Sequence, residues 1–142
     1  TIAYSSDWNL VGLPLQVDVP HYAVIFPDAI EGTLFSFNEG YNPEEILVYG
    51  NGYWLRFPSE SNVIITGLPI EELTISLAQG WNLITGIGFP FNLNDIVDAD
   101  NIIVDGTLYS FADGYHPVDI LDPGKGYWVR ANNSGFITLI DN

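Results

Sequence analysis

The residues best suited to chemistry lie in a phrase that the chain contains twice, "GNGYWLRFP" at 50–58 and "GKGYWVRAN" at 124–132. Each copy places an arginine two residues after a tryptophan. Side chains two apart on a strand share one face. An indole ring can stack on a sugar ring while a guanidinium donates to a hydroxyl, so the candidate sugar-binding residues are Trp54, Arg56, Trp128 and Arg130.

The same phrase also has a structural interpretation. A strand that is apolar on both faces is usually central and buried. A duplicated fold needs its anchors in both copies, so repetition at equal spacing favours a packing role for these aromatic residues. The candidate structural core is Trp8, Trp54, Trp81, Trp128, Tyr53 and Tyr127.

A second group with chemical potential is the acidic stretch "DIVDADNIIVDG" at 95–106. Carboxylates are the ligands that calcium prefers, but this stretch lacks the order of ligands and glycine of an EF-hand. Calcium is therefore only a weak expectation, and no other cofactor is expected. The weak calcium candidates are Asp95, Asp98, Asp100 and Asp105.

Signals for catalysis are thin. His21 and His116 occupy non-equivalent positions and have no motif partner, and no G-x-S-x-G or phosphate-binding glycine loop is present. The paired acids Glu44 and Glu45 could in principle hydrolyse glycosides. In the second copy Val118 and Asp119 replace them, which indicates a solvated turn. The expectation is that the chain is not an enzyme.

An internal duplication positions all of these residues. Residues 31–56 lie over residues 105–130 without a gap, with fifteen of 26 positions identical, and residues 1–12 lie over 74–85. The expected units are a first repeat at 1–73 and a second at 74–142, packed as one compact unit.

Composition limits the possible partners. Eighteen acidic residues face three basic ones, for a net charge of −15, which argues strongly against nucleic acid. No apolar run is long enough for a membrane span, so membrane insertion is not expected. The chain has no cysteine, which excludes disulfides and thiolate metal sites.

Short β-branched and aromatic runs, separated by Gly, Pro, Asn and Asp, recur through the chain. They predict an all-β fold of two pseudo-repeats with about five strands each, forming a sandwich or barrel-like domain with little helix. A turn or two of helix is expected at 92–100, with an asparagine cap. Helical turns are also expected at "PEEIL" and "PVDIL", which begin at Pro43 and Pro117.

The segments "GWNLI" at 80–84 and "PGKGYWVRA" at 123–131 resemble the β-rich modules that recur in secreted and surface proteins of bacteria and archaea. The second copy fits this pattern better, since Asp7 and Asn51 depart from it in the first. The resemblance implies an extracellular or cell-surface location and a β-rich architecture, and no catalytic residues.

The leading functional expectation is an extracellular structural module of a surface stalk, adhesin or filament. Its partner would be a second copy of the chain or a neighbouring module of a surface protein. The alternative is a carbohydrate-binding accessory module with a glycan as partner.

The terminal segments suggest how a filament would form. We expect residues 62–67 to pair with residues 74–79 and so join the copies, which leaves one strand open at each terminus. The open strands, residues 1–6 and residues 136–140, would pair with each other within one chain, or head-to-tail between subunits. The candidate subunit-contact residues are Thr1, Ile2, Ala3, Tyr4, Phe136, Ile137, Leu139 and Ile140.

Overall fold

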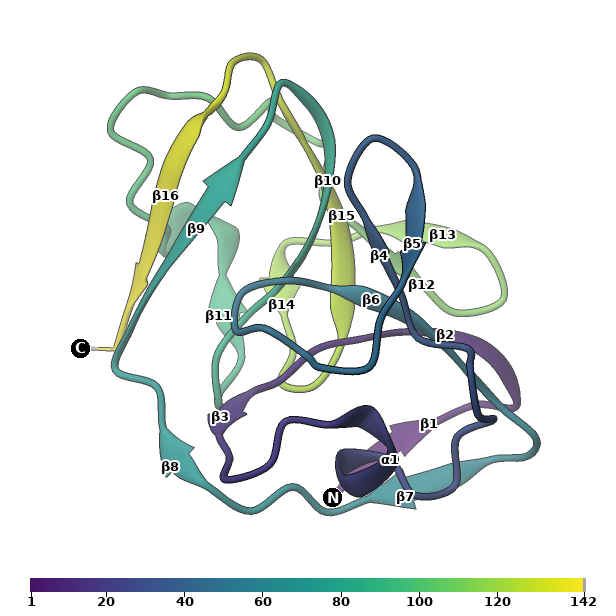
Figure 1. The fold of residues 1–142 in the computed structure, drawn as a ribbon. Helices are drawn as coiled ribbons and strands as arrows, with labels where there is room; N and C mark the ends of the chain where they lie inside the picture. The colour runs from purple at the N-terminus through teal and green to yellow at the C-terminus, as the bar shows by residue number, and fades with distance from the viewer. Residues whose placement is uncertain (142) are drawn as a thin grey trace.

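A computed structural model describes residues 1–141 and shows an all-β chain. Strands account for 47% of the residues and helices for 5%, which confirms the predicted fold class. All paired strands are antiparallel, and the chain forms several small sheets (Figure 1). Neither helical element is long and apolar enough to cross a membrane.

The two copies contain matching series of elements. The first copy contains β1 (Ile2–Tyr4), β2 (Asp7–Val11), β3 (Leu15–Gln16), α1 (Tyr22–Ile25), β4 (Phe35–Phe37), β5 (Tyr41–Pro43), β6 (Tyr53–Phe57), β7 (Ser61–Val63) and β8 (Leu68–Pro69). The second copy contains β9 (Glu72–Leu77), β10 (Gly80–Thr85), β11 (Phe91–Asn92), the 3₁₀ turn η1 (Leu93–Asp95), β12 (Tyr109–Phe111), β13 (Tyr115–Pro117), β14 (Ile120–Leu121), β15 (Gly126–Ala131) and β16 (Gly135–Ile140). The described residues form sixteen strands, more than the predicted total of about ten, and ten of the sixteen are only two or three residues long.

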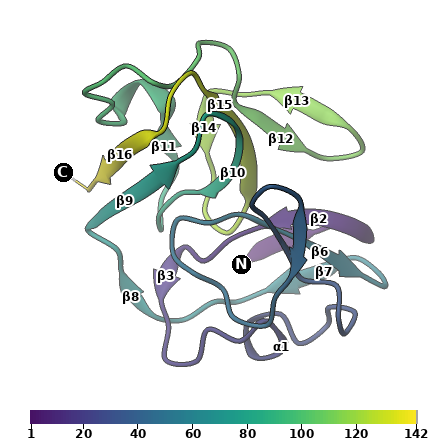
Figure 2. The same ribbon diagram turned by 45° about the horizontal axis from the view of Figure 1, so that its top comes forward.

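Each copy builds the same four-stranded sheet. The strand order is β2-β6-β4-β5 in the first copy and β10-β15-β12-β13 in the second. The remaining strands form two-stranded sheets, β1 with β7, β3 with β8, β9 with β16, and β11 with β14. Figure 2 shows the first copy below and the second above, with the hairpin β12–β13 reaching outward from the second.

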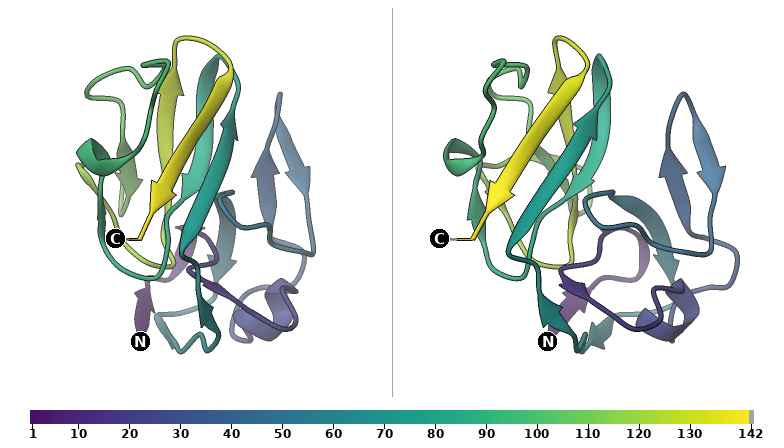
Figure 3. Two further views of the ribbon diagram at one scale, coloured as in Figure 1. Left: turned by 90° about the vertical axis from the view of Figure 1, so that its left-hand side faces the viewer. Right: turned by 60° about the vertical axis from the view of Figure 1, so that its left-hand side comes forward.

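The predicted pairing of the terminal segments is wrong within the chain. Residues 62–67 do not pair with residues 74–79, because β7 pairs with β1 and β9 pairs with β16 (Figure 3). The register places Ile75 opposite Ile137, and both side chains are buried in the core of the second copy. The alternating apolar residues of β9 and β16 therefore share one core. Residues 1–6 do not fold onto residues 136–140, and their pairing with another molecule stays a prediction.

The local predictions of helix were partly wrong. The turn η1 begins after Asn92, whose side chain accepts from the Asn94 amide at 2.8 Å, which confirms the capped turn there. The segments after Pro43 and Pro117 are not helical, since each proline ends a strand. The next amides donate to the sheet instead, Glu44 to the Leu34 carbonyl at 2.9 Å and Val118 to the Leu108 carbonyl at 3.0 Å.

Three hydrophobic clusters hold the molecule together. One lies in the first copy around Phe26, Leu55 and Phe57, and one lies mainly in the second copy around Leu121, Val129 and Ile137. The third lies between the copies and contains Leu10, Leu83 and Trp128, with four partly buried aromatic residues packed against them. The two copies thus share an aromatic layer.

Backbone contacts between the copies are exchanged symmetrically through the glycine-flanked loops. The amide of Gly12 donates to the Gly124 carbonyl at 3.2 Å, and the equivalent amide of Thr85 donates to the Gly50 carbonyl at 3.0 Å. The isolated bridges Val11↔Lys125 and Ile84↔Asn51 are equivalent in the same way. The loop before each G-Y-W strand therefore docks on the other copy.

Candidate functional site

Each four-stranded sheet presents an aromatic outer face. Residues directly opposite on antiparallel strands share a face. Trp8 is opposite Arg56, and Leu10 and Phe35 are both opposite Trp54. The second copy repeats the arrangement with Trp81 opposite Arg130, and with Leu83 and Tyr109 opposite Trp128.

The hairpins bring the two aromatic faces together. Phe37 at the end of β4 packs edge-to-face on Trp128 of the other copy, with ring centroids 4.9 Å apart and planes at 77°. Phe111 at the end of β12 packs on Trp54 at 4.9 Å and 78°. Edge-to-face packing is a favoured arrangement of aromatic pairs. Each hairpin therefore supplies a wall to the sheet of the other copy.

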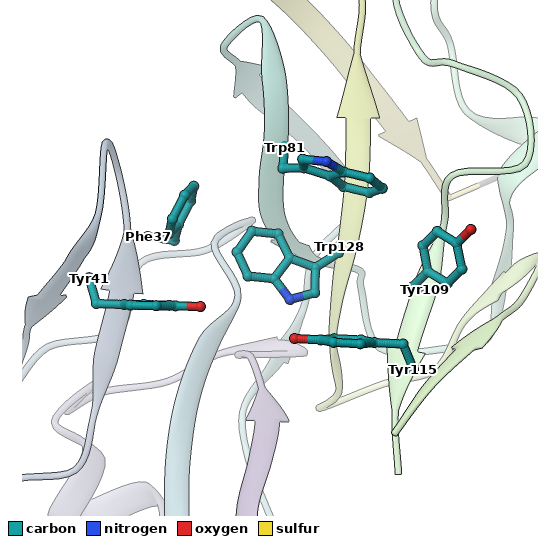
Figure 4. A pocket seen from close by; sticks show the side chains of 6 residues that line it. All are labelled: Phe37, Tyr41, Trp81, Tyr109, Tyr115 and Trp128. Carbon is teal, nitrogen blue, oxygen red and sulfur yellow. The ribbon is translucent and has the colours of Figure 1, made fainter. Parts of the chain in front are cut away.

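A cleft of about 520 Å³ opens between these walls, and we call it cleft 1. Its lining consists of Phe37, Tyr41, Trp81, Tyr109, Tyr115 and Trp128. In Figure 4 the rings of Trp81 and Tyr115 lie above and below the indole of Trp128, with Tyr109 on one side and Phe37 on the other. The rings therefore surround the cleft from several directions.

A second cleft of about 430 Å³, cleft 2, lies in the equivalent place on the other sheet. Its lining consists of Trp8, Phe35, Tyr41, Trp54 and Phe111. In the repeat alignment these residues correspond to Trp81, Tyr109, Tyr115, Trp128 and Phe37, all of which line cleft 1. The two clefts are pseudo-symmetric copies of one site, and Tyr41 lines both.

The polar groups that the lining residues offer are few. They are the phenol groups of Tyr41, Tyr109 and Tyr115 and the indole N–H groups. No carboxylate, amide or guanidinium belongs to either lining. Within residues 1–141, the buried Trp128 Nε1 makes no hydrogen bond of good geometry, and the Tyr41 and Tyr115 hydroxyls converge on its side in Figure 4. The indole N–H is close enough to the Tyr115 hydroxyl to lower the pKa of that phenol slightly, against the larger effect of burial. Burial raises the pKa of Tyr115, so this phenol is neutral at physiological pH.

An arginine flanks the aromatic face of each sheet. The Arg56 Nε atom donates to the Asp7 Oδ1 atom at 2.7 Å, across the exposed surface beside Trp8. The equivalent of Asp7 in the second copy is Gly80. Within residues 1–141, Arg130 has no carboxylate within 4.0 Å.

The residues predicted for the core differ in how deeply they are buried. Tyr53 and Tyr127 are buried, and each hydroxyl accepts from a backbone amide, of Val48 at 2.8 Å and of Asp122 at 2.7 Å. Trp128 is also buried.

The other three tryptophans correct the expectation of a common core. Trp8 and Trp54 are half-buried, and Trp81 is 44% exposed. The reason is that all four tryptophans lie on the sheet faces that point toward the other copy, and the hairpin of that copy covers these faces only in part. The predicted pairs Trp54/Arg56 and Trp128/Arg130 do lie on these faces, although neither arginine lines a cleft.

Sequence reasoning missed the hairpin residues, although a signal was present. The segments "LFSFNEGY" and "LYSFADGY" alternate aromatic and polar residues, which places Phe35 and Phe37 on one face of a strand. Tyr41 and Tyr115 follow on the return strands and are 56% and 54% exposed. Exposed aromatic residues at equivalent positions of both copies are the pattern that indicated a site.

The metal and histidine candidates lie apart from the clefts. Within residues 1–141, no three acidic or histidine side chains are grouped to hold a metal, so the four aspartates are not gathered. The Asp98 carboxylate instead accepts from the amides of Ile102 and Ile103, each at 2.9 Å, and shapes its own loop. His21 caps α1, and His116 bonds to the Ala112 carbonyl.

Comparisons with models of protein families, with curated proteins and with solved structures found no match for this chain.

Proposed function

We propose that the chain is a non-catalytic binding module whose two aromatic clefts hold quaternary ammonium groups. The observation that carries the proposal is the all-aromatic lining of cleft 1, in which ring faces and edges from both copies surround one space. Aromatic ring faces attract organic cations through their quadrupoles.

The lining favours a quaternary ammonium over a primary one. A primary ammonium carries three N–H donors that must be satisfied when water is removed. The lining offers few hydrogen-bond acceptors for such donors. A quaternary ammonium has no N–H group, so contact with ring faces is all that it requires.

The charge of the whole chain supports a cationic ligand. With eighteen acidic residues and three basic ones, the molecule attracts cations and repels anions at long range. Each ring in contact with a desolvated cation contributes about 0.5–2 kcal/mol, so three or four rings supply at most about 8 kcal/mol before the cost of association, and we expect a Kd of about 1 mM or weaker.

The lining is less suited to a neutral glycan. Sugar hydroxyls need several hydrogen-bond partners when they leave water. The phenols and indoles of the clefts could form hydrogen bonds with only a few of these hydroxyls. Glycan binding through the exposed face of Trp81 is the competing outcome of the experiment below.

The test is a fluorescence and calorimetric titration with choline and with its uncharged isostere 3,3-dimethylbutan-1-ol. We expect choline to bind at two sites per chain and the uncharged isostere to bind at least about tenfold more weakly, because cation–π attraction requires the charge. Equal affinity for the two compounds, or binding only to members of a glycan panel, would contradict the proposal.

Single substitutions assign the sites. Trp81→Ala should remove the site in cleft 1, and Trp8→Ala the site in cleft 2, each reducing the stoichiometry from two to one. Phe136→Ala is the matched control, because Phe136 is 66% exposed on β16 and lines neither cleft. This variant should bind two equivalents.

The role expected from the sequence, an extracellular structural module of a surface stalk, adhesin or filament, also remains a proposal. Two cation-binding clefts in one chain suit a surface module that holds a polymer or layer carrying many such groups.

A further inference from the structure

The two clefts differ in charge at one equivalent position beside their tryptophans. Asp7 precedes Trp8, whereas Gly80 precedes Trp81. Both positions have a positive φ, 75° at Asp7 and 100° at Gly80, and a Cβ atom at Gly80 would meet no other atom within 4 Å. The difference therefore concerns the side chain and not the fold.

This difference decides whether the neighbouring arginine is free. In the first copy, the Asp7 carboxylate forms an ion pair with the Arg56 guanidinium, with the Oδ1 and Nε atoms 2.7 Å apart. In the second copy, the glycine offers no carboxylate, and no other acid of residues 1–141 replaces it. Among residues 1–141, Arg130 is thus an exposed cation without an ion pair, in a strongly acidic molecule.

Arg130 stands next to cleft 1. It lies directly opposite Trp81 on the same face, and Cβ atoms of such pairs are about 4.5–5.5 Å apart. Trp81 forms one wall of the cleft. A ligand held against Trp81 can therefore extend a short anionic arm to the guanidinium, which binds phosphate or carboxylate through paired N–H donors.

We infer that cleft 1 takes a zwitterion, with its quaternary ammonium among the rings and its phosphate or carboxylate on Arg130, whereas cleft 2 takes the cation alone. This inference rests on the proposed function. A free anion is repelled by the net charge of −15, so only an anionic group tethered to the cation gains from Arg130.

The test compares choline with phosphocholine at each cleft. The Trp8→Ala protein isolates cleft 1, and the Trp81→Ala protein isolates cleft 2. The titrations are made at about pH 5.5, where the phosphate monoester carries mainly one negative charge and phosphocholine is a zwitterion. We expect phosphocholine to bind cleft 1 about tenfold more tightly than choline, as one charge-assisted bond provides. We expect cleft 2 to show no such preference, because Asp7 already forms an ion pair with Arg56 and its carboxylate repels the phosphate.

Two substitutions in the Trp8→Ala background identify the cause. Arg130→Gln should abolish the preference for phosphocholine while leaving the Kd for choline unchanged. Gly80→Asp should do the same by recreating the pair seen between Asp7 and Arg56. Arg56→Gln is the matched control and should leave the preference intact.

The reciprocal change makes the test symmetric. In the Trp81→Ala background, Asp7→Gly should free Arg56 and give cleft 2 a preference for phosphocholine. Sedimentation with phosphatidylcholine vesicles then separates the sources. Binding to vesicles assigns a lipid headgroup, and binding to free phosphocholine alone assigns a soluble or polymer-linked group; both uphold the inference.

The outcomes distinguish this inference from the function on which it rests. Equal binding of choline and phosphocholine at cleft 1 overturns the inference and leaves the proposed function standing. A preference that survives Arg130→Gln also overturns it. Failure of both compounds to bind at either cleft overturns the proposed function, and the inference with it.

Discussion

Individual residues explain why the chain contains its G-x-G-Y-W phrase twice. Gly52 lies so close to the other copy that a Cβ atom there would be 2.6 Å from the Ile84 carbonyl oxygen. Gly50 and Gly124 adopt positive φ values of 86° and 79°, which glycine accepts without strain. The following tyrosine anchors its own loop through its hydroxyl, and the tryptophan faces the other copy. The phrase is therefore the joint between the copies.

The buried tyrosines make the protein sensitive to alkali. Burial raises the pKa of Tyr127 to about 12 and also raises that of Tyr53. A group whose pKa is higher in the folded state contributes stability that is complete below its unfolded pKa, about 10, and is lost as the pH rises through 12. We therefore expect the free energy of unfolding to fall between pH 10 and pH 12.

Tyr127→Phe isolates this effect in urea unfolding at several pH values. The variant should be about 1 kcal/mol less stable at pH 7, because the Asp122 amide loses its acceptor. It should lose less stability than the wild type between pH 10 and pH 12. Burial lowers the pKa of Lys125, which titrates with the opposite sign, but it is present in both proteins and cancels. Parallel curves would contradict the assignment.

At the scale of elements, the hairpins β4–β5 and β12–β13 connect the copies. Each belongs to one sheet, yet its phenylalanine packs on the tryptophan of the other. Each copy therefore contributes a hairpin ring to the sheet of the other, and residues of both copies line each cleft.

Removal of one hairpin phenylalanine ring should change the environment of the tryptophan in the other copy. Phe37→Ala should cost about 1–3 kcal/mol, since the ring is half-buried, and should change the fluorescence of Trp128 and not of Trp54. Phe111→Ala should do the reverse. Single-tryptophan versions of the protein allow the measurement, with Phe136→Ala as a control within about 0.5 kcal/mol of the wild type. A response confined to the substituted copy would contradict the exchange.

The elements also show how far the sequence could be interpreted. Alternation and turn residues predicted an all-β fold of two repeats with about five strands each, and the capped turn at Asn92, because these depend on local properties. The partner of each strand depends on closure of the core. β7 and β9 are neighbours along the chain, yet they pair with β1 and β16. The exposure of Trp81 depended on a hairpin from the other copy, which no local pattern contains.

At the scale of the whole molecule, neither copy is complete alone. The exchanged loop bonds, the bridges Val11↔Lys125 and Ile84↔Asn51, and the aromatic layer all join residues of different copies. A single copy would expose Leu10 or Leu83 together with several rings, a patch that isolated soluble domains rarely leave uncovered.

We therefore expect separated copies to reassociate. Residues 1–71 and 72–142, purified apart and mixed, should form a one-to-one complex that restores the tryptophan fluorescence of the intact chain. The second fragment alone should form a dimer in sedimentation, since its loop and hairpin can exchange with a second copy of itself. Stable monomers of both fragments that do not combine would show that the copies are independent.

Tyr41 is a wall common to both clefts, and this has a consequence for thermodynamic linkage. A ligand in one cleft restricts the phenol ring and so changes the conformational entropy that a ligand in the other must still remove. The two binding equilibria are then coupled, and the coupling free energy has the same magnitude in both directions. A duplicated site with a shared wall thus gains a route to cooperativity that two separate modules on a flexible linker would lack.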